Sequence, residues 1–321
     1  MRFYSLVIPV YNRPQEVDEL LESLTYQTYS NFEVIIVEDG SSDPCKSITE
    51  KYNNSLDIKY FFKENEGQGP ARNFGFEHAK GDYFIAYDSD CIIPPRYLTF
   101  VDEAIEKEHW DAFGGPEKAH EGFTLVQKAI TYSMTSPITT GGIRGGKKHI
   151  GTYHPRGFNM GISRKVFEKT GGFVFERMGE DIEFSIRIIE SGFKVGLIEE
   201  AFVYHKRRTG LFAFYKQVYS FGRTRIMLSR VHPKELKLVH AMPAFFVLAV
   251  LLIPVLYFLS SILFKASLAL AGLFYLAIFI TSIAAQKNLA VACLSLLTST
   301  IQLLGYGLGF LSEGSKKLLA E

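Results

Sequence analysis

Three long apolar runs in the C-terminal third of the sequence limit what this chain can fold into. Residues 241–312 contain only two charged side chains, Lys265 and Lys287. These lysines divide the stretch into three runs: 241–264, 266–285 and 288–311. Each run has about 20 residues, the length of a helix that crosses the hydrocarbon core of a bilayer. A helix of a soluble bundle needs a polar face, which these runs lack, so the sequence predicts about three membrane helices.

The N-terminal 200 residues differ from this region in composition. The apolar run from Phe3 to Val10 is short and contains Pro9, so it does not resemble a signal peptide, and this part of the chain is expected to stay in the cytosol. The net charge of +1 gives no indication of a nucleic-acid partner. Cys45, Cys91 and Cys293 are odd in number and far apart, so neither a disulfide framework nor a zinc site is expected.

A basic segment, residues 206–237, precedes the first apolar run. It contains nine Lys and Arg residues and one acidic residue, Glu235, with aromatic side chains interleaved. This pattern indicates an amphipathic segment at a membrane interface, where cations lie near anionic headgroups. A solvated helix face is the alternative. The excess of Lys and Arg also predicts that the N-terminal domain lies on the cytoplasmic side of the cell (inner) membrane.

Short apolar segments alternate with amphipathic segments in the N-terminal part. Strands are expected at residues 5–10, 32–37, 58–62, 83–87 and 201–204. Helices are expected at residues 15–25, 47–52, 70–78, 97–107, 125–134 and 181–191. Apart from its helix, region 117–151 is expected to be a mobile loop with a basic group: Arg144, Lys147, Lys148 and His149. The alternation predicts a parallel sheet with crossover helices.

Two aspartates follow the strand that is expected at 83–87. Asp88-Ser89-Asp90 places two carboxylates, one residue apart, at the carboxyl end of a buried strand. Carboxylate oxygens are suitable ligands for Mg²⁺ or Mn²⁺, with open positions left for phosphate oxygens. A polar turn that caps the strand is the alternative.

Polar turns also follow three other predicted strands of this part of the chain, and two of these turns contain glycine. They are Tyr11-Asn12, Asp39-Gly40-Ser41 and the segment 65–73. Ligands of open α/β sheets bind at the carboxyl ends of the strands. We therefore expect a nucleotide to bind at this edge of the sheet.

Taken in order, these motifs resemble those of the inverting family 2 glycosyltransferases. That family has the GT-A fold, a Rossmann-like nucleotide-diphospho-sugar transferase domain, and the resemblance covers roughly residues 5–225. The donor-binding residues that it implies are Pro9, Tyr11, Asp39, Arg72, Asp88, Ser89 and Asp90. Asp39 would bond the base, commonly uracil, and Asp88 would lie near the ribose. Asp90 would hold the Mn²⁺ or Mg²⁺ that bridges the diphosphate.

The resemblance extends to Gly179-Glu180-Asp181. It implies that Asp181 is the catalytic general base, which takes the proton of an acceptor hydroxyl as the hydroxyl attacks the anomeric carbon. It also implies that Glu180 orients the acceptor. A helix cap is the alternative role for Asp181.

Further candidates lie on both sides of this motif. His205 follows a predicted strand, and a histidine in this place is a metal ligand in some GT-A enzymes. A packed or hydrogen-bonded histidine is the alternative. Arg207 and Arg208 could neutralise the departing diphosphate. The acceptor-side candidates are Glu180, Asn159, Gln217 and Arg223, and the segment 217–223 resembles that of non-processive exopolysaccharide glucosyltransferases.

The sequence as a whole predicts an α/β catalytic domain of the GT-A type, followed by transmembrane helices. The expected parts are a catalytic domain 1–210, an interfacial segment 211–240, a membrane region 241–312 and a tail 313–321. The expected function is metal-dependent transfer from a nucleotide sugar, most simply a UDP-sugar, to a lipid-linked saccharide in surface polysaccharide synthesis. A polyprenyl-phosphate glycosyltransferase is one alternative. A nucleotidyltransferase and a non-catalytic nucleotide-binding membrane regulator are alternatives from other classes.

Overall fold

The computed structural model of the chain describes residues 1–140 and 153–320. The chain divides into two compact units. The first unit consists of Met1–His120 and Ile143–Lys206, and the second of Glu121–Gly142 and Arg207–Glu321. Glu121–Gly142 therefore belongs to the second unit, although it lies inside the range expected for the catalytic domain. The basic group from Arg144 to His149 lies outside the described residues.

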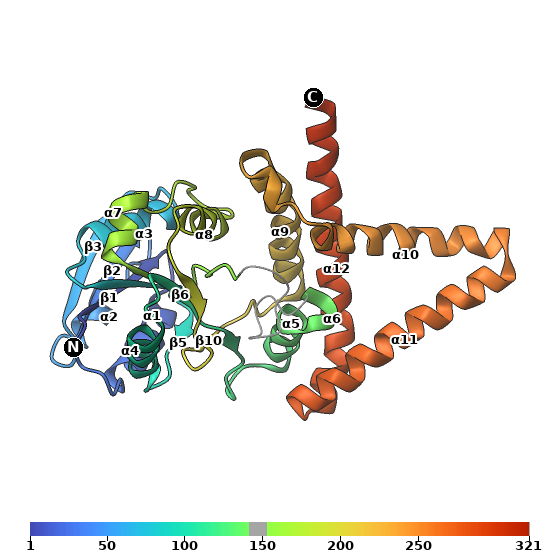
Figure 1. The fold of residues 1–321 in the computed structure, drawn as a ribbon. Helices are drawn as coiled ribbons and strands as arrows, with labels where there is room; N and C mark the ends of the chain where they lie inside the picture. Colours follow the sequence, from blue (N-terminus) through green and yellow to red (C-terminus); the bar gives the residue numbers. More distant parts are fainter. Residues whose placement is uncertain (141–152, 321) are drawn as a thin grey trace. The chain divides into compact units, whose positions relative to one another are not determined.

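A mixed sheet of seven strands forms the centre of the first unit (Figure 1). In sheet order its strands are β3 (Ile58–Lys63), β2 (Phe32–Asp39), β1 (Tyr4–Val10), β4 (Tyr83–Tyr87), β8 (Asn159–Ser163), β6 (Ala112–Gly114) and β9 (Val195–Leu197). β1 to β4 are mutually parallel, as the sequence predicted, whereas β8 runs antiparallel to both of its neighbours. A smaller sheet contains β5 (Cys91–Ile92), β10 (Val203–His205) and β7 (Glu117–Lys118).

The side chains of β1 alternate between two hydrophobic layers. Leu6 and Ile8 pack into the core beneath helices α1 (Pro14–Thr25) and α4 (Tyr97–Glu108). Val7 points to the opposite face and packs with residues of three other helices: α3 (Gln68–Glu77), α7 (Arg164–Thr170) and α8 (Glu180–Glu190). This period of two is what a strand buried on both faces requires. The short helix α2 (Lys46–Glu50) completes the unit.

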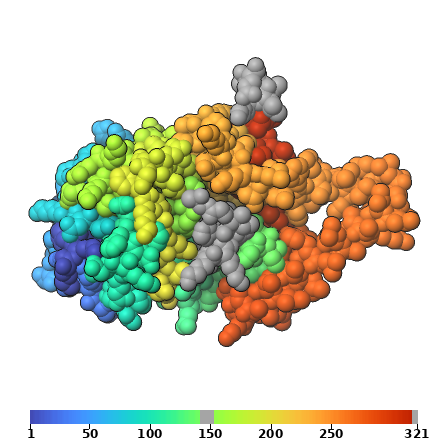
Figure 2. All heavy atoms as spheres, in the orientation of Figure 1, coloured from blue at the N-terminus to red at the C-terminus, as the bar shows by residue number. Residues whose placement is uncertain are grey.

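The second unit is helical. Its helices are α5 (Leu125–Thr135), α6 (Pro137–Thr140), α9 (Leu211–Val231), α10 (Met242–Leu259), α11 (Ser261–Gln286) and α12 (Leu289–Ala320), with 3₁₀ turns at Pro233–Glu235 and Leu238–Ala241. Three segments are long and apolar enough to cross a membrane: Leu238–Leu259, Ser261–Gln286 and Leu289–Lys316. Within this unit, the orange helices α10 and α11 project from α12 and meet at a turn (Figures 1 and 2).

Candidate functional site

The parallel strands bring several predicted residues to one edge of the first unit's sheet. Asp39 is the last residue of β2, and Glu38 lies beside Val10 of β1. Asp88 follows the last residue of β4, which is the other neighbour of β1. Because β1, β2 and β4 run in the same direction, their carboxyl ends share this edge. The alternation of strands and helices predicted parallel strands, and parallel strands place these residues at one edge of the sheet.

Asp39 holds the segment that follows β3. Its carboxylate is 4% exposed and accepts hydrogen bonds from the backbone N–H groups of Glu66 (3.0 Å) and Gly67 (2.9 Å). Lys63 lies 3.2 Å from one of the same oxygens. A carboxylate has about four lone-pair sites, so these bonds still leave acceptor capacity. Asp39 thus fixes the loop into α3 and retains room for another donor.

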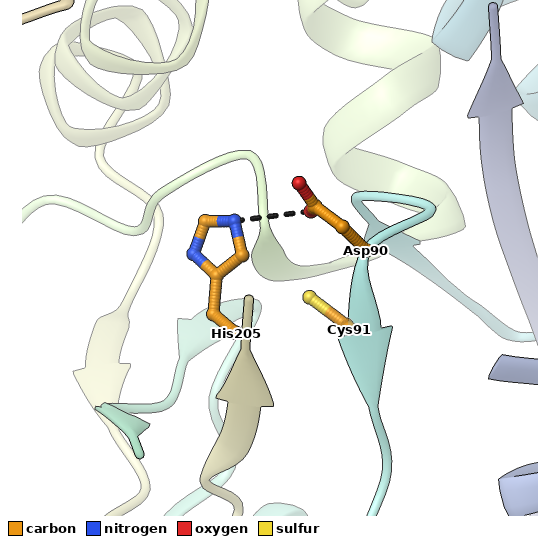
Figure 3. Close-up of side chains that lie close together, drawn as sticks. All are labelled: Asp90, Cys91 and His205. Atoms are coloured by element: carbon orange, nitrogen blue, oxygen red, sulfur yellow. Dashed lines mark ion pairs between the residues drawn. The ribbon is translucent and has the colours of Figure 1, made fainter. Parts of the chain in front are cut away.

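His205 faces the Asp88-Ser89-Asp90 turn because β10 pairs with β5. In that pairing His205 lies opposite Cys91, and its Nε2 is 3.1 Å from Oδ1 of Asp90 (Figure 3). The same nitrogen is 3.8 Å from Oδ2 of Asp88. The ring of Phe158 stacks on the imidazole at a centroid distance of 4.9 Å. The sequence left open whether His205 is a metal ligand or a packed histidine. In the structure it lies beside both aspartates.

Glu117 fixes the orientation of this imidazole from the opposite side. It belongs to β7, which pairs with β10, and its Oε2 lies 2.9 Å from Nδ1 of His205. The Glu117 side chain is 1% exposed. A carboxylate that accepts the Nδ1 proton leaves Nε2 as a lone-pair donor, which is the usual arrangement around a histidine that ligates a metal. The residues present therefore fit a divalent cation held by Asp88, Asp90 and His205.

Cys91 is close enough to join this cluster, since its Sγ and the ligand atoms of Asp90 and His205 lie within 4.8 Å of one another. Burial raises the pKa of the Cys91 thiol well above its usual value. The thiol also lies 3.6 Å from the carbonyl oxygen of Phe158. Mn²⁺ and Mg²⁺ prefer oxygen and imidazole ligands to sulfur, so Cys91 is better explained as a packed thiol.

Asp90 is held in its charged form by two neighbours. Burial alone would raise its pKa, but His205 and Arg13 together hold that pKa well below the usual range. Arg13 forms an ion pair with the second oxygen of Asp90. Arg13 was not predicted as a site residue, although it directly follows the Tyr11-Asn12 turn.

Arg72 connects the aspartate turn to the Glu180-Asp181 pair. Its guanidinium is 2.7 Å from Oδ1 of Asp88 and 3.0 Å from Oε1 of Glu180, and the residue is only 1% exposed. Gly157 packs directly on it, because a Cβ at Gly157 would lie 2.7 Å from the guanidinium. Arg72 therefore neutralises two carboxylates of different motifs, one on each side of it.

The two acidic residues that begin α8 have different environments. Burial, together with the nearby charge of Asp181, raises the pKa of Glu180 to about 7, although Arg72 opposes the shift. Asp181 accepts hydrogen bonds from the backbone N–H groups of Gly157 (3.2 Å) and Ile182 (2.8 Å). Asp181 therefore has a fixed orientation, and among the described residues no cation forms an ion pair with it.

The remaining predicted residues lie in varied surroundings. Tyr11 is 54% exposed after β1, Pro9 lies within that strand, and Ser89 is buried. Asn159 is fully buried, and its carboxamide accepts a bond from Tyr97 and donates one to the carbonyl of Ala201, which is a structural role. Its acceptor-side role stays a prediction.

Four predicted residues belong to the second unit. They are Arg207, Arg208, Gln217 and Arg223. Arg208 is exposed, and the side chain of Gln127 donates to the carbonyl of Arg207 at 2.9 Å. Arg223 lies 3.2 Å from Glu313 of the same unit.

Comparison with known proteins shows which family the chain belongs to. The family model described as glycosyl transferase family 2 matches residues 5–171. An uncharacterized glycosyltransferase of Haemophilus influenzae is 32% identical over 219 residues, which are 64% of this chain and 70% of that protein. The chain belongs to glycosyltransferase family 2. An uncharacterized glycosyltransferase of Rickettsia felis is 44% identical over 86 residues, which cover 27% of this chain and 14% of that longer protein.

Solved structures share the fold of this family 2 glycosyltransferase. A mannosyltransferase from Pyrobaculum calidifontis, PcManGT, solved with GDP-Man and Mn²⁺, matches with a TM-score of 0.67 at 16% identity, over 94% of this chain and 87% of that one. Residues 1–349 of Staphylococcus aureus TarS, solved with UDP-GlcNAc, match with a TM-score of 0.50 at 21% identity, over 98% of this chain and 92% of that one. The predicted GT-A fold with C-terminal apolar helices is thereby confirmed.

Proposed function

We propose that this family 2 enzyme is an inverting, metal-dependent glycosyltransferase that acts at the inner membrane. It would move a sugar from a nucleotide-diphosphate sugar, with UDP-sugars as the first choice, to a lipid-linked saccharide in surface polysaccharide synthesis. The observation that carries the proposal is the buried Arg72, which pairs at once with Asp88 and Glu180. Through this arginine, the residues proposed for the donor and those proposed for the acceptor belong to one ion-pair network.

The donor would bind at the carboxyl ends of β1, β2 and β4. Asp39 retains acceptor capacity for the ring N–H of a uracil base, and the half-exposed Tyr11 is available to stack on that base with Pro9 beneath it. Asp88 would contact the ribose, with Ser89 beside it. PcManGT was solved with GDP-Man and TarS with UDP-GlcNAc, so the choice of base is an outcome of the experiment below.

Asp90 and His205, with Asp88 beside them, would hold Mn²⁺ or Mg²⁺. The bound cation supplies positive charge that stabilises the diphosphate as it leaves. A hydrogen bond from Nδ1 of His205 to Glu117 would leave the Nε2 lone pair for the cation. Arg207 and Arg208 are proposed as further cations for the diphosphate.

Asp181 would perform the proton transfer. Its carboxylate takes the proton of an acceptor hydroxyl, the hydroxyl oxygen forms a bond to the anomeric carbon, and the bond from that carbon to the diphosphate oxygen breaks. The nucleoside diphosphate leaves with the electron pair of the broken bond. A single in-line displacement inverts the configuration at the anomeric carbon. Glu180 is proposed to orient the acceptor beside this base.

The helical unit suggests that the acceptor is attached to a lipid. Three of its segments are long and apolar enough to cross a bilayer. Helix α9, which precedes them in the sequence, carries four cations and no acidic residue. Gln217 and Arg223 of α9, together with Asn159, are the proposed acceptor-side residues. The same unit also suits a polyprenyl phosphate as acceptor. Such a phosphate is already ionised and has less need of a base than a hydroxyl.

Turnover of a donor panel tests the proposal. The purified protein in nanodiscs would receive UDP- and GDP-sugars with Mn²⁺ or Mg²⁺ and a bacterial lipid extract, and release of nucleoside diphosphate would be measured. We expect release that depends on lipid, stops with chelator and falls roughly 10²–10⁴-fold in Asp181→Asn. Asp57→Asn, which changes an exposed aspartate of the same unit, is the matched control and should keep full activity.

Other outcomes separate the alternatives. Metal-dependent release that survives Asp181→Asn would favour the polyprenyl-phosphate acceptor. Inorganic diphosphate from a nucleoside triphosphate would instead indicate a nucleotidyltransferase. Binding of nucleoside diphosphate without turnover of any donor would contradict the proposal and favour a non-catalytic regulator.

A further inference from the structure

The three apolar segments of the helical unit differ in how much of their surface the protein covers. Within the most apolar part of each segment, 11% of the residues of Leu238–Leu259 and of Ser261–Gln286 are buried, against 44% for Leu289–Lys316. Long apolar side chains such as Phe258, Ile262 and Leu270 are more than two-thirds exposed on α10 and α11. Exposed apolar surface of this extent on α10 and α11 indicates contact with lipid or with another protein. Much more of α12 is already buried by other parts of the same unit.

Besides the ends of α10 and α11, two less apolar helices, α5 and α9, cover α12. Near its middle, the hydroxyl of Thr298 donates to the carbonyl oxygen of Ala129 on α5 at 3.1 Å. Farther along, α12 packs on α9 so closely that neither helix accepts a methyl group at the glycines of this contact. A Cβ at Gly309 would lie 2.0 Å from the carbonyl oxygen of Tyr219, and a Cβ at Gly222 would lie 2.0 Å from that of Tyr306. Such backbone contact makes α9 and α12 a single packed element.

The charges of α9 oppose placing this packed pair inside a bilayer. α9 contains four cations, Lys216, Arg223, Arg225 and Arg230, and no acidic residue. Arg223 and Arg230 pair with the buried Glu313 of α12, at 3.2 and 2.8 Å. Charged side chains in the hydrocarbon core are costly. If α12 crossed the bilayer, its partner α9 would bring these cations into the hydrocarbon core.

The hairpin of α10 and α11 has no such obstacle. Among the residues of these two helices, Lys265 is the only charged one, and it lies close to the turn that joins them. From that position its amine can reach the polar surface at the far side. The helices have 18 and 26 residues, so their lengths of about 27 and 39 Å suit a hydrocarbon core of about 30 Å.

We propose that α10 and α11 cross the bilayer as a two-helix hairpin, and that α12 lies with α9 at the surface from which the chain entered. The inference rests on the membrane location in the proposed function and adds the number of crossings. Two crossings return Lys316 to the side of the basic segment, as the preference of Lys and Arg for the cytoplasmic side requires. Three crossings, which the apolar runs alone suggest, would place Lys316 on the opposite side.

Cysteine labelling in oriented membrane vesicles tests the topology. Cys45 and Cys91 are buried, so Cys293→Ala provides a background without an exposed thiol among the described residues. Single cysteines would then replace three exposed residues: Thr209 before α9, Ser261 at the hairpin turn and Ser315 near the end of α12. The probe is a membrane-impermeant maleimide, applied to inside-out and to right-side-out vesicles.

We expect Thr209→Cys and Ser315→Cys to react in inside-out vesicles, and Ser261→Cys to react only in right-side-out vesicles. Reaction of Ser315→Cys together with Ser261→Cys would overturn the inference in favour of three crossings. Reaction of all three cysteines in inside-out vesicles alone would overturn it in favour of a hairpin that does not cross. Release of the protein by alkaline carbonate would contradict the membrane location itself, which is a distinguishable failure of the proposed function.

Discussion

Replacing Glu180 by Gln should change how the stability of the first unit depends on pH. Glu180 is 4% exposed, and burial, the charge of Asp181 and the opposing charge of Arg72 give it a pKa of about 7. The ordinary value for the side chain is 4.5. Glutamine keeps an oxygen that can accept the bond from Arg72 but cannot ionise. The variant therefore removes one titration and little else.

The sign follows from which state binds more protons. Between pH 4.5 and about 7 the folded state keeps a proton on Glu180 that the unfolded state has lost, so the free energy of unfolding falls as the pH rises through this window. A shift of this size corresponds to about 3 kcal/mol. For a domain of roughly 200 residues, each kcal/mol moves Tm by about 2–4 °C. We therefore expect the Tm of Glu180→Gln, relative to wild type, to rise by roughly 6–12 °C between about pH 5 and about pH 8.

The single tryptophan provides the assay. Trp110 belongs to the first unit, so its fluorescence during heating reports on that unit in detergent or nanodiscs. Glu190→Gln, which removes an exposed carboxylate from the end of the same helix, is the matched control and should follow wild type at every pH. A Tm difference between Glu180→Gln and wild type that is constant from pH 5 to pH 8 would refute the reasoning.

Three further changes test other parts of the structure. Glu117→Gln should weaken Mn²⁺ binding roughly 10–100-fold by calorimetry, because the neutral amide replaces the carboxylate that orients His205. Unchanged affinity would contradict this role of Glu117. Arg72→Met should lower the free energy of unfolding by about 3–5 kcal/mol in the Trp110 melt, since it leaves the buried carboxylate of Glu180 unpaired. Lys51→Met, in an exposed pair, should cost at most about 1 kcal/mol. Equal losses would contradict the role of burial. Gly309→Ala should destabilise the helical unit by about 1–3 kcal/mol through overpacking, while Gly314→Ala, with open space around its Cβ position, should not; circular dichroism melts compare the two.

The sequence predicted the part of the site that depends on local pattern. Asp39 and Asp88 were identified because each lies at the end of a short apolar run that predicts a strand, and the carboxyl ends of parallel strands share an edge. Glu180 and Asp181 were identified by resemblance, at the start of a helix that the spacing of its isoleucines predicted. These patterns involve only residues that are neighbours in the sequence, so they can be recognised without knowledge of the tertiary fold.

Residues that act through short strands or distant contacts were missed. Glu117 belongs to a strand of two residues, which is too short to show any periodicity, and it meets His205 across 88 positions of sequence. Arg13 meets Asp90 across 77 positions. Arg72 was expected near the nucleotide, but its two ion pairs with Asp88 and Glu180 could not be read from spacing. These contacts form only when the strands and helices pack together, so no local sequence pattern indicates them.

By itself, the sequence determined the fold class and the presence of apolar helices, because strand period, turn residues and run length are local properties. The order of its motifs indicated the family by resemblance. Only the tertiary structure decided how the carboxylates are paired and which apolar helix the protein already covers. Burial and pairing depend on residues that are far apart in the chain. The apolar run of α12 is as clear in the sequence as that of α10. That the basic helix α9 packs on α12 is shown only by the tertiary structure.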